Sequence, residues 1–356
     1  MVPGIGGILA RNLVSYLGSV EQIFNTPLAR LKKIPGIGDN LAYRICETDI
    51  LETAKRELDF IAKNEIRVYF YLDDDYPIRF RQCADAPILF YLKGNADIET
   101  EKIISIVGTR KATEYGRQVC DELIRDIAEA GHEALIVSGM AYGIDIQAHK
   151  SALKYNLPTV GVLGHGLDVL YPRAHINTAN AMLTQGGLLS DFASESIIDR
   201  GNFVRRNRLI AGLSDATVVV ESGAKGGALI TAEIAASYDR DVYAFPGRSI
   251  DPYSKGCNYL IKNNIAALIE DGNDLMFMLG WDKPGVQKQP VQQSLFSELT
   301  DDEQLIVGQL HRNEKIFIDS LRHNTLLPMN KLSGLLLTLE FKGLVEALPG
   351  KMYRLK

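Results

Sequence analysis

Glycine-rich turns followed by helices mark several points along this sequence where a phosphate group could bind. The stretch VVVESGAKGGALITAE, residues 218–233, reads as an apolar strand, a glycine-rich turn and a helix. That layout is typical of a phosphate-binding loop, because the amides that open a helix face outward and favour anions. The phosphate could belong to a nucleotide cofactor, to a small nucleotide substrate or to the backbone of a nucleic acid.

Similar turns follow four other predicted strands. The turns have the sequences VGTRKATEYG, SGMAYGIDIQAHK, LGHGLDVLYP and FPGRS. The first two contain Gly108, Arg110, Lys111, Ser138, Gly139 and Lys150. Because the carboxyl ends of parallel strands meet at one edge of a sheet, five such turns predict a floor of backbone amides and helix N-termini that suits anions.

Basic residues surround an aromatic residue in the stretch RGNFVRRNRLIAGLSDA. It holds Arg200, Phe203, Arg205, Arg206, Asn207 and Arg208. Arginine can bind a phosphate through two hydrogen bonds and an aromatic ring can stack on a base, a combination that favours a single strand over a duplex. In the alternative interpretation Phe203 belongs to the core and one or two of the arginines pair with Glu221 and Asp191. We interpret Arg200–Phe203 as part of an arginine loop and RRNRLIAGLSDA as a helix start that leads into a strand, so Asn207 and Arg208 would be structural polar residues beneath the loop.

The motifs of several enzyme classes are missing. No Gly-Lys-Ser/Thr closes the loop at 222–227, no G-x-G-x-x-G opens the first turn, and no acidic residue ends the second strand, which argues against ATP hydrolysis and against NAD. Neither G-x-S-x-G nor H-E-x-x-H occurs. His149 and His165 fall near the predicted site, where we expect local hydrogen bonding. We therefore expect no catalytic residue, no cofactor and no metal.

Apolar strands alternate with amphipathic helices from Ile103 onward, which predicts a doubly wound, mostly parallel α/β sheet covered on both faces. Strands are predicted at Ile103–Val107, Ala134–Val137, Thr159–Leu163, Leu188–Ser190, Ala216–Glu221, Val242–Phe245 and Ala266–Ile269. Helices are predicted at Glu114–Ala130, Asp145–Tyr155 and Ala228–Tyr238. Two short strands, in IRVYFYLDDDYPIRF and APILFYLKGN, precede them.

Smaller domains flank this sheet. VPGIGGILARNLV and IPGIGDNLAYRIC repeat a helix-hairpin-helix pattern, so residues 1–62 predict a small helical domain that either approaches a phosphate or is a compact turn without a ligand. Because the chain opens inside this motif, we expect a short leading helix to be missing. Residues 63–285 form the central domain and 286–298 a linker rich in Gln, Pro and Ser. Residues 299–356 predict a winged helix whose leucine-rich third helix favours a protein contact or a structural role over DNA reading.

Composition limits where and how a nucleic acid could bind. The 356 residues carry a net charge of −5, so a nucleic acid would need a focused basic patch. Four scattered cysteines indicate a reducing compartment, with no zinc site and no disulfide framework. No apolar run reaches membrane-spanning length and no signal peptide opens the chain, so we expect a cytoplasmic protein.

Six ordered motifs resemble the DNA-processing protein A family (DprA, also called Smf). They are VGTRKATEYG, SGMAYGIDIQAH, GVLGHGLDVLYP, FVRRNRLIAGLS, GGALITAEIA and FPGRS…SKGCNYLI. The resemblance covers about residues 66–271 and implies an extended Rossmann fold that binds single-stranded DNA, forms dimers and loads RecA recombinase during natural transformation. The chain departs from the family at Asp191, where the family often has Glu, and at Val204, where it often has Pro.

The resemblance implies a DNA pocket that uses Arg110, the Ser138-Gly139 turn, the Arg200–Phe203 segment and Lys225. The glycine-rich turns and the basic stretch add further residues to the predicted DNA-binding set. The full set is Gly108, Arg110, Lys111, Ser138, Gly139, Lys150, Arg200, Phe203, Arg205, Arg206, Asn207, Lys225, Gly226 and Gly227. In a second hypothesis GGALITAE resembles the glycine-rich turn of LOG-type phosphoribohydrolases, with Glu233 as a catalytic acid on a nucleoside monophosphate. We expect a two-fold homodimer through residues 260–281, because the run Leu275–Trp281 looks hard to bury within one subunit.

Overall fold

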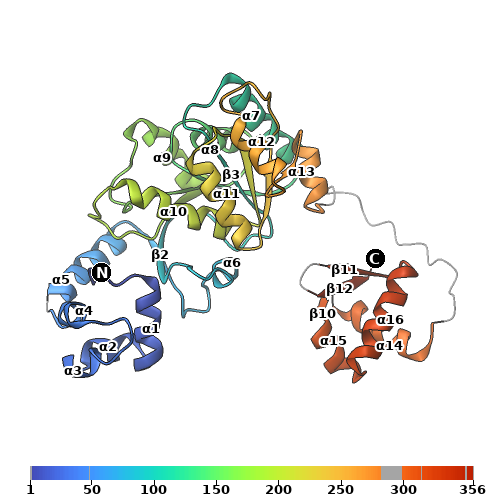
Figure 1. Cartoon of the computed structure of the whole chain (residues 1–356), viewed down its shortest axis with the longest axis horizontal. Coiled ribbons are helices and arrows are strands. Elements are labelled where there is room, and N and C mark those ends of the chain that lie inside the picture. Colours follow the sequence, from blue (N-terminus) through green and yellow to red (C-terminus); the bar gives the residue numbers. More distant parts are fainter. Residues whose placement is uncertain (1, 48, 282–298, 314, 349–350, 356) are drawn as a thin grey trace. The chain divides into compact units, whose positions relative to one another are not determined.

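The computed structural model describes residues 2–47, 49–281, 299–313, 315–348 and 351–355. Residues 1–285 form one compact unit and residues 286–356 form a second (Figure 1). The predicted linker, 286–298, lies outside the described residues. Within the described ranges, no helix is both long and apolar enough to span a membrane.

The N-terminal part consists of short helices joined by glycine turns. These are α1 (Gly7–Leu17), α2 (Val20–Asn25), α3 (Leu28–Leu31), α4 (Asp39–Ile45) and α5 (Asp49–Lys63). Gly4 and Gly36, in the two repeated turns, have φ angles of 85° and 84°, a backbone region that favours glycine. Leu13, Leu31 and Ala42 pack in a small core of their own. The helix-hairpin-helix prediction is therefore confirmed.

A nine-stranded sheet forms the centre of the described chain, in the order β1-β2-β6-β5-β4-β3-β7-β8-β9. The strands are β1 (Arg67–Phe70), β2 (Leu89–Gly94), β3 (Ile103–Gly108), β4 (Leu135–Gly139), β5 (Thr159–Val162), β6 (Gly186–Ser190), β7 (Ala216–Glu221), β8 (Asp241–Ala244) and β9 (Ala267–Leu268). From β6 across to β9 all neighbours are parallel, whereas β1 and β2 extend the sheet in antiparallel pairing. The predicted mostly parallel sheet is confirmed.

Helices cover both faces of the sheet, as Figure 1 shows. They are α6 (Ile78–Arg81), α7 (Glu114–Glu129), α8 (Ile144–Lys154), η1 (Arg173–His175), α9 (Ile176–Gln185), α10 (Arg200–Leu213), α11 (Gly227–Ser237), α12 (Lys255–Lys262) and α13 (Gly272–Met278). Strand β3 shows why helices must cover both faces of the sheet. Ile103 and Val107 belong to one buried cluster and Ile104 and Ile106 to the other, because alternate side chains of a strand point to opposite faces.

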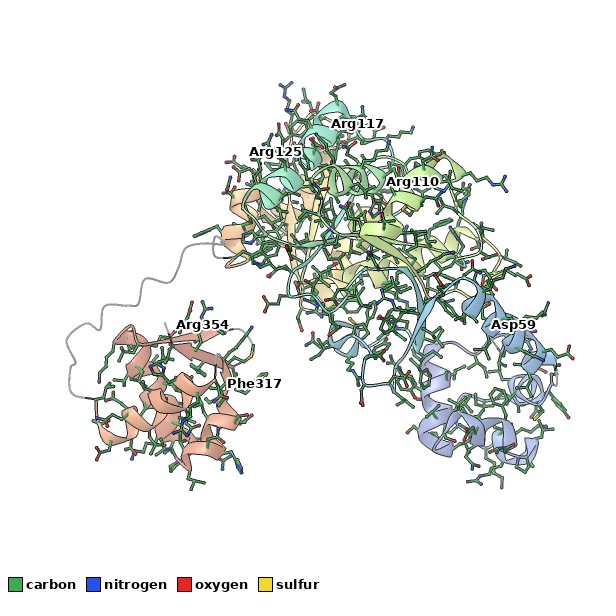
Figure 2. All side chains as sticks on the ribbon, turned by 180° about the vertical axis from the view of Figure 1, so that it is seen from behind. Asp59, Arg110, Arg117, Arg125, Phe317 and Arg354 are labelled. Atoms are coloured by element: carbon green, nitrogen blue, oxygen red, sulfur yellow. The ribbon has the colours of Figure 1, made fainter. Side chains whose placement is uncertain are left out.

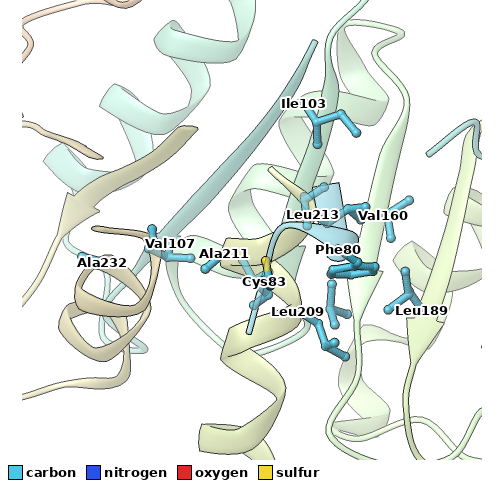
Figure 3. Close-up of a cluster of buried hydrophobic side chains, with 14 of the residues drawn as sticks. Phe80, Cys83, Ile103, Val107, Val160, Leu189, Leu209, Ala211, Leu213 and Ala232 are labelled. Atoms are coloured by element: carbon cyan, nitrogen blue, oxygen red, sulfur yellow. The ribbon is translucent and has the colours of Figure 1, made fainter. Parts of the chain in front are cut away.

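The first of these clusters packs α10 against the sheet (Figure 3). Phe80, Leu209 and Leu213 are at most 1% exposed and lie together with Val160 and Leu189 of the strands. This packing fixes the position of α10, the helix that carries the predicted arginine cluster.

The C-terminal unit is a winged helix, as predicted. It contains α14 (Asp301–Arg312), β10 (Ile316–Phe317), α15 (Ile318–Thr325), α16 (Met329–Phe341), β11 (Val345–Leu348) and β12 (Met352–Leu355). Lys331 and Lys342 of the third helix lie 2.5 and 2.7 Å from the carboxylates of Asp302 and Glu303. Residues 349 and 350 lie outside the described residues.

The run Leu275–Trp281 corrects one expectation. Leu275 and Met276 are buried in the same cluster as Ile104 and Ile106 of β3, and Trp281 packs against that cluster. Phe277 and Met278 are 85% and 48% exposed. The expectation that the whole run is hard to bury is therefore wrong, because α13 turns one face to the core and leaves these two side chains on the surface.

Candidate nucleic-acid interface

A cavity of about 770 Å³ lies at the carboxyl edge of the sheet, where β3 and β7 are neighbours. The strand order reverses at this point, because β4 lies on one side of β3 and β7 on the other. In doubly wound sheets a crevice forms at such a switch point. The cavity is lined by the turns that follow β3 and β7 and by α10. Predicted residues that line it are Gly108, Arg110, Arg200, Phe203, Arg206, Asn207, Lys225, Gly226 and Gly227.

The turn after β7 supplies the start of a helix and a cation. Helix α11 begins at Gly227, and its N-cap residue Gly226 provides no side-chain cap, so the first amides of the helix have no partner from that residue. Lys225 and Gly226 are exposed at the cavity. Asn207 of α10 donates to the carbonyl of Gly227 at 3.2 Å and so joins the two helices. The arrangement suits a phosphate group.

The turn after β3 supplies a second cation to the same cavity. Arg110 is exposed at the carboxyl end of β3 and lines the cavity (Figure 2). No ion pair joins Arg110 or Lys225 to another residue of the described ranges. Both side chains are therefore available to an anionic ligand.

The arginine segment is a helix from its first residue. Asp199 caps α10 by accepting a hydrogen bond from the amide of Gly201 at 2.7 Å. The interpretation of Arg200–Phe203 as part of a loop is therefore wrong. Its helical course spaces Arg200, Phe203 and Arg206 three residues apart, which puts all three on one side of the helix, at the cavity.

Arg206 lies in the floor of the cavity and is only 5% exposed. Its guanidinium donates to the carbonyl of Val162, and its Nε has no hydrogen-bond partner within the described part of the chain. Burial lowers the pKa of Arg206 and raises the pKa of the neighbouring Asp145 to about 6. Both side chains converge over Gly139, where an added Cβ would lie 2.3 Å from the Asp145 Oδ2 atom and 2.4 Å from the guanidinium.

Phe203 joins this cavity to a second one of about 410 Å³. The second cavity is lined by Tyr142 and Tyr171, which are 51% and 53% exposed. The ring of Phe203 is half-buried, lies 5.8 Å from the ring of Tyr171 and belongs to none of the buried clusters of the described residues. The structure thus leaves part of Phe203 open to the solvent.

The alternative interpretation of the arginines holds for Arg208. Its guanidinium forms an ion pair with Asp191 and donates to the carbonyl of Asp85. Arg205 is exposed on the other side of α10, where it lies 5.2 Å from the centre of the Phe192 ring. The expected pairing with Glu221 is wrong, because the Glu221 carboxylate accepts hydrogen bonds from Thr113 instead.

The remaining predicted residues lie outside the cavity lining. Ser138 is buried and its hydroxyl donates to the carbonyl of Ile106 at 2.6 Å. Gly139 lies beneath Asp145, and Lys111 and Lys150 are exposed and do not line the cavity. The expectation that the two nearby histidines make local hydrogen bonds is confirmed, since His149 contacts the Gly139 carbonyl at 2.8 Å and His165 contacts that of Gly166 at 2.9 Å.

Three residues of the site were missed in the sequence. Asp145 opens α8, and Tyr142 and Tyr171 follow strands β4 and β5. The signal for Asp145 was its place in the first helical turn after a glycine-rich loop. The two tyrosines had no such signal, because their proximity depends on how neighbouring loops fold together.

Thr231 and Glu233, in the stretch that resembles phosphoribohydrolases, lie in different surroundings. Thr231 is buried and its hydroxyl donates to the carbonyl of Gly227 at 3.0 Å, within its own helix. Glu233 is exposed and lines the cavity. The described residues contain no group of three or more His, Cys, Asp or Glu side chains that could hold a metal ion.

Fold and site together define a Rossmann-like protein with an anion-binding cavity at the switch point of its sheet, flanked by a helix-hairpin-helix region and a winged helix. Models of three families match the chain. Residues 67–280 match DNA recombination-mediator protein A, residues 1–48 match the SAM-like helix-hairpin-helix tandem, and residues 290–351 match the DprA winged helix domain. The chain belongs to the DNA recombination-mediator protein A family (DprA, also called Smf).

Individual relatives agree with this assignment. The DNA processing protein DprA of Streptococcus pneumoniae is 37% identical over 205 residues, which cover 58% of this chain and 71% of the relative. Protein Smf of Synechocystis is 32% identical over 286 residues, or 78% of this chain and 70% of the relative. The solved structure of the Streptococcus protein superposes with a TM-score of 0.67 at 31% identity and covers 75% of this chain and 91% of that one.

A further solved structure bears on the ligand. It is DNA processing protein A from Helicobacter pylori, described as showing a unique single-stranded DNA binding mode. It superposes with a TM-score of 0.54 at 28% identity and covers 60% of this chain and 95% of that one.

Proposed function

We propose that this protein binds single-stranded DNA in the 770 Å³ cavity and loads RecA recombinase onto the bound strand during natural transformation or recombination. The observation that carries the proposal is the meeting of two unpaired cations, a buried arginine and an uncapped helix start beside a partly exposed aromatic ring. The single-strand binding described for the Helicobacter relative supports the same ligand.

Each part of the site has a distinct role in this proposal. Arg110 and Lys225 contact phosphates from the turns after β3 and β7, and Arg200 extends the cationic rim along α10. The amides at Gly226 and Gly227 donate hydrogen bonds to the phosphate between them. Arg206 supplies a positive charge from below, and its buried Nε has no hydrogen-bond partner within the described residues.

The aromatic residues favour a single strand. Phe203 stacks with an unpaired base, and the second cavity with Tyr142 and Tyr171 offers room for a neighbouring base. In a duplex the bases are already stacked and paired, so they cannot reach these rings without a cost of a few kcal/mol. Lys111 and Lys150, which are exposed outside the cavity lining, and Arg205, on the other side of α10, guide the strand beyond the cavity.

We also propose a two-fold homodimer through residues 260–281. Phe277, Met278 and Leu268 are between 41% and 85% exposed in this region. A dimer joins two DNA cavities, which raises the effective concentration for the second contact on a long strand. Such a dimer would hold a longer strand for the recombinase than one cavity can.

A binding titration with matched variants tests the proposal. Wild-type protein should bind a fluorescent 30-nucleotide strand, and Arg110→Ala should weaken binding about tenfold, as expected for one charge-assisted phosphate contact. Arg125→Ala is the control, because the half-buried Arg125 pairs with Asp126 and lies outside the cavity lining. Equal binding by all three proteins would contradict this DNA site.

Two further assays address the finer claims. RecA filament formation on a single strand should be faster in the presence of the protein than in its absence. Purified protein incubated with nucleoside monophosphates should release no free base; release that disappears in Glu233→Gln would establish the phosphoribohydrolase alternative instead.

A further inference from the structure

One residue, Glu221, holds both ends of the turn that carries Arg110. The carbonyl of Glu221 accepts a hydrogen bond from the amide of Thr109 at 2.7 Å. Its carboxylate accepts from the amide of Thr113 at 2.9 Å and from the hydroxyl of Thr113 at 2.8 Å. The turn between Thr109 and Thr113 is therefore closed at both ends by a residue of another strand.

Glu221 also stands at the junction of the two halves of the DNA site. It is the last residue of β7, and the turn that carries Lys225 begins directly after it. The register between β3 and β7 shifts at Gly108, which pairs with Glu221. A single side chain thus connects the turn after β3 with the strand that leads into the turn after β7.

The surrounding structure is fitted to this carboxylate. Glu221 is only 5% exposed, and no cation pairs with it among the described residues. At Gly116, in the first turn of α7, an added Cβ would lie 2.4 Å from the Glu221 Oε2 atom. Glycine at that position lets the helix approach the carboxylate closely, while the Thr113 hydroxyl caps the same helix through the amide of Gly116 at 3.1 Å.

A buried negative charge at this place works against the binding of a phosphate. The carboxylate raises the energy of any anion in the adjacent cavity, since the low-dielectric interior screens it weakly. The carboxylate accepts two hydrogen bonds from Thr113, which offset part of that cost. What they fix is the course of the turn from which Arg110 reaches into the cavity.

We propose that Glu221 is a positioning residue for the DNA site, which holds the Arg110 turn in its binding geometry through Thr113. The inference rests on the proposed single-strand binding at this cavity. It separates two properties of Glu221: its shape and hydrogen bonds support binding, whereas its charge opposes it.

Two substitutions distinguish these properties. Glu221→Gln keeps the shape and an acceptor for the Thr113 amide while it removes the charge, so binding should stay within about twofold of wild type or become tighter. Glu221→Ala releases the turn, so binding should weaken about tenfold. The slope of log K against log salt concentration should become shallower by about 0.7, the value for one lost phosphate contact. A residue with a purely structural role would lower the melting temperature without changing the salt dependence.

A double-mutant cycle with Arg110 gives the decisive test. In the Arg110→Ala background, Glu221→Ala should weaken single-strand binding by less than about twofold, because the contact that it positions is already gone. An equal loss in both backgrounds, or wild-type binding by Glu221→Ala, would overturn the inference while leaving the DNA site intact. Wild-type protein that binds no single strand would overturn the proposed function, and this inference with it.

A second pair of variants keeps the test decisive should Glu221→Ala not fold. Thr113→Val removes the hydroxyl that contacts the carboxylate, and Thr113→Ser retains it. We expect Thr113→Val to reduce affinity and salt dependence in the same direction as Glu221→Ala, and Thr113→Ser to bind like wild type. Identical binding by the two Thr113 variants would overturn the inference.

Discussion

Replacement of Phe203 by alanine tests base stacking at the site. Stacking of a base on an aromatic side chain contributes about 1–3 kcal/mol, which corresponds to a loss of roughly 5- to 150-fold in affinity. Because the ring of Phe203 is already half-covered, with Tyr171 at 5.8 Å, we expect the lower part of this range, about tenfold. The loss should be similar for strands of different sequence, since every base has a stacking face.

The same substitution should leave the fold intact. A half-buried ring contributes less than the roughly 3–5 kcal/mol of a fully buried one, so the melting temperature should fall by only a few degrees. Phe192→Leu is a suitable control, because Phe192 is 9% exposed and lines neither of the two cavities. Fluorescence anisotropy and thermal unfolding measure both effects. Unchanged affinity, or a large fall in melting temperature for Phe203→Ala, would refute the stacking role.

Three further outcomes are expected. Arg110→Ala and Lys225→Ala should each weaken binding for all DNA sequences, and each should make the slope of log K against log salt concentration shallower by about 0.7, the value for one lost phosphate contact. An unchanged slope in both variants would mean that the DNA follows another path. Burial raises the pKa of Asp145 to about 6, and a nearby phosphate favours its protonated form, so affinity should rise as the pH falls through about 6. Titrations between pH 5 and 8 should show this rise for wild type and its loss in Asp145→Asn; the same pH profile in both would exclude Asp145 as the cause. Phe277→Glu or Met278→Glu should give monomers in sedimentation that bind short strands normally and long strands weakly, whereas monomeric wild-type protein would contradict the dimer.

Much of the central fold could be predicted from local pattern alone. The run at 103–108 is apolar on both sides of the strand, which identifies a buried parallel strand, and the glycine turns that follow identify the binding edge. The two turns near the N-terminus were recognisable in the sequence because their backbone conformation, with positive φ angles, requires glycine.

The direction of individual side chains could not be predicted in the same way. Arg206 and Arg208 are two residues apart in one basic run, yet one lies in the cavity floor and the other pairs with Asp191. The difference depends on the rotation of α10 against the sheet, which is set by the packing of Leu209 and Leu213. The burial of Met276 depends in the same way on how α13 packs against a helix that is distant in the sequence.

Competition between single-stranded and double-stranded DNA of equal length tests the central claim most directly. At the same salt concentration, a 30-nucleotide single strand should bind at least about tenfold tighter than its duplex, because only the single strand can stack a base on Phe203. Arg110→Ala should weaken binding of the single strand in the same titration. Equal affinity for the two forms, or tighter binding of the duplex, would contradict the account.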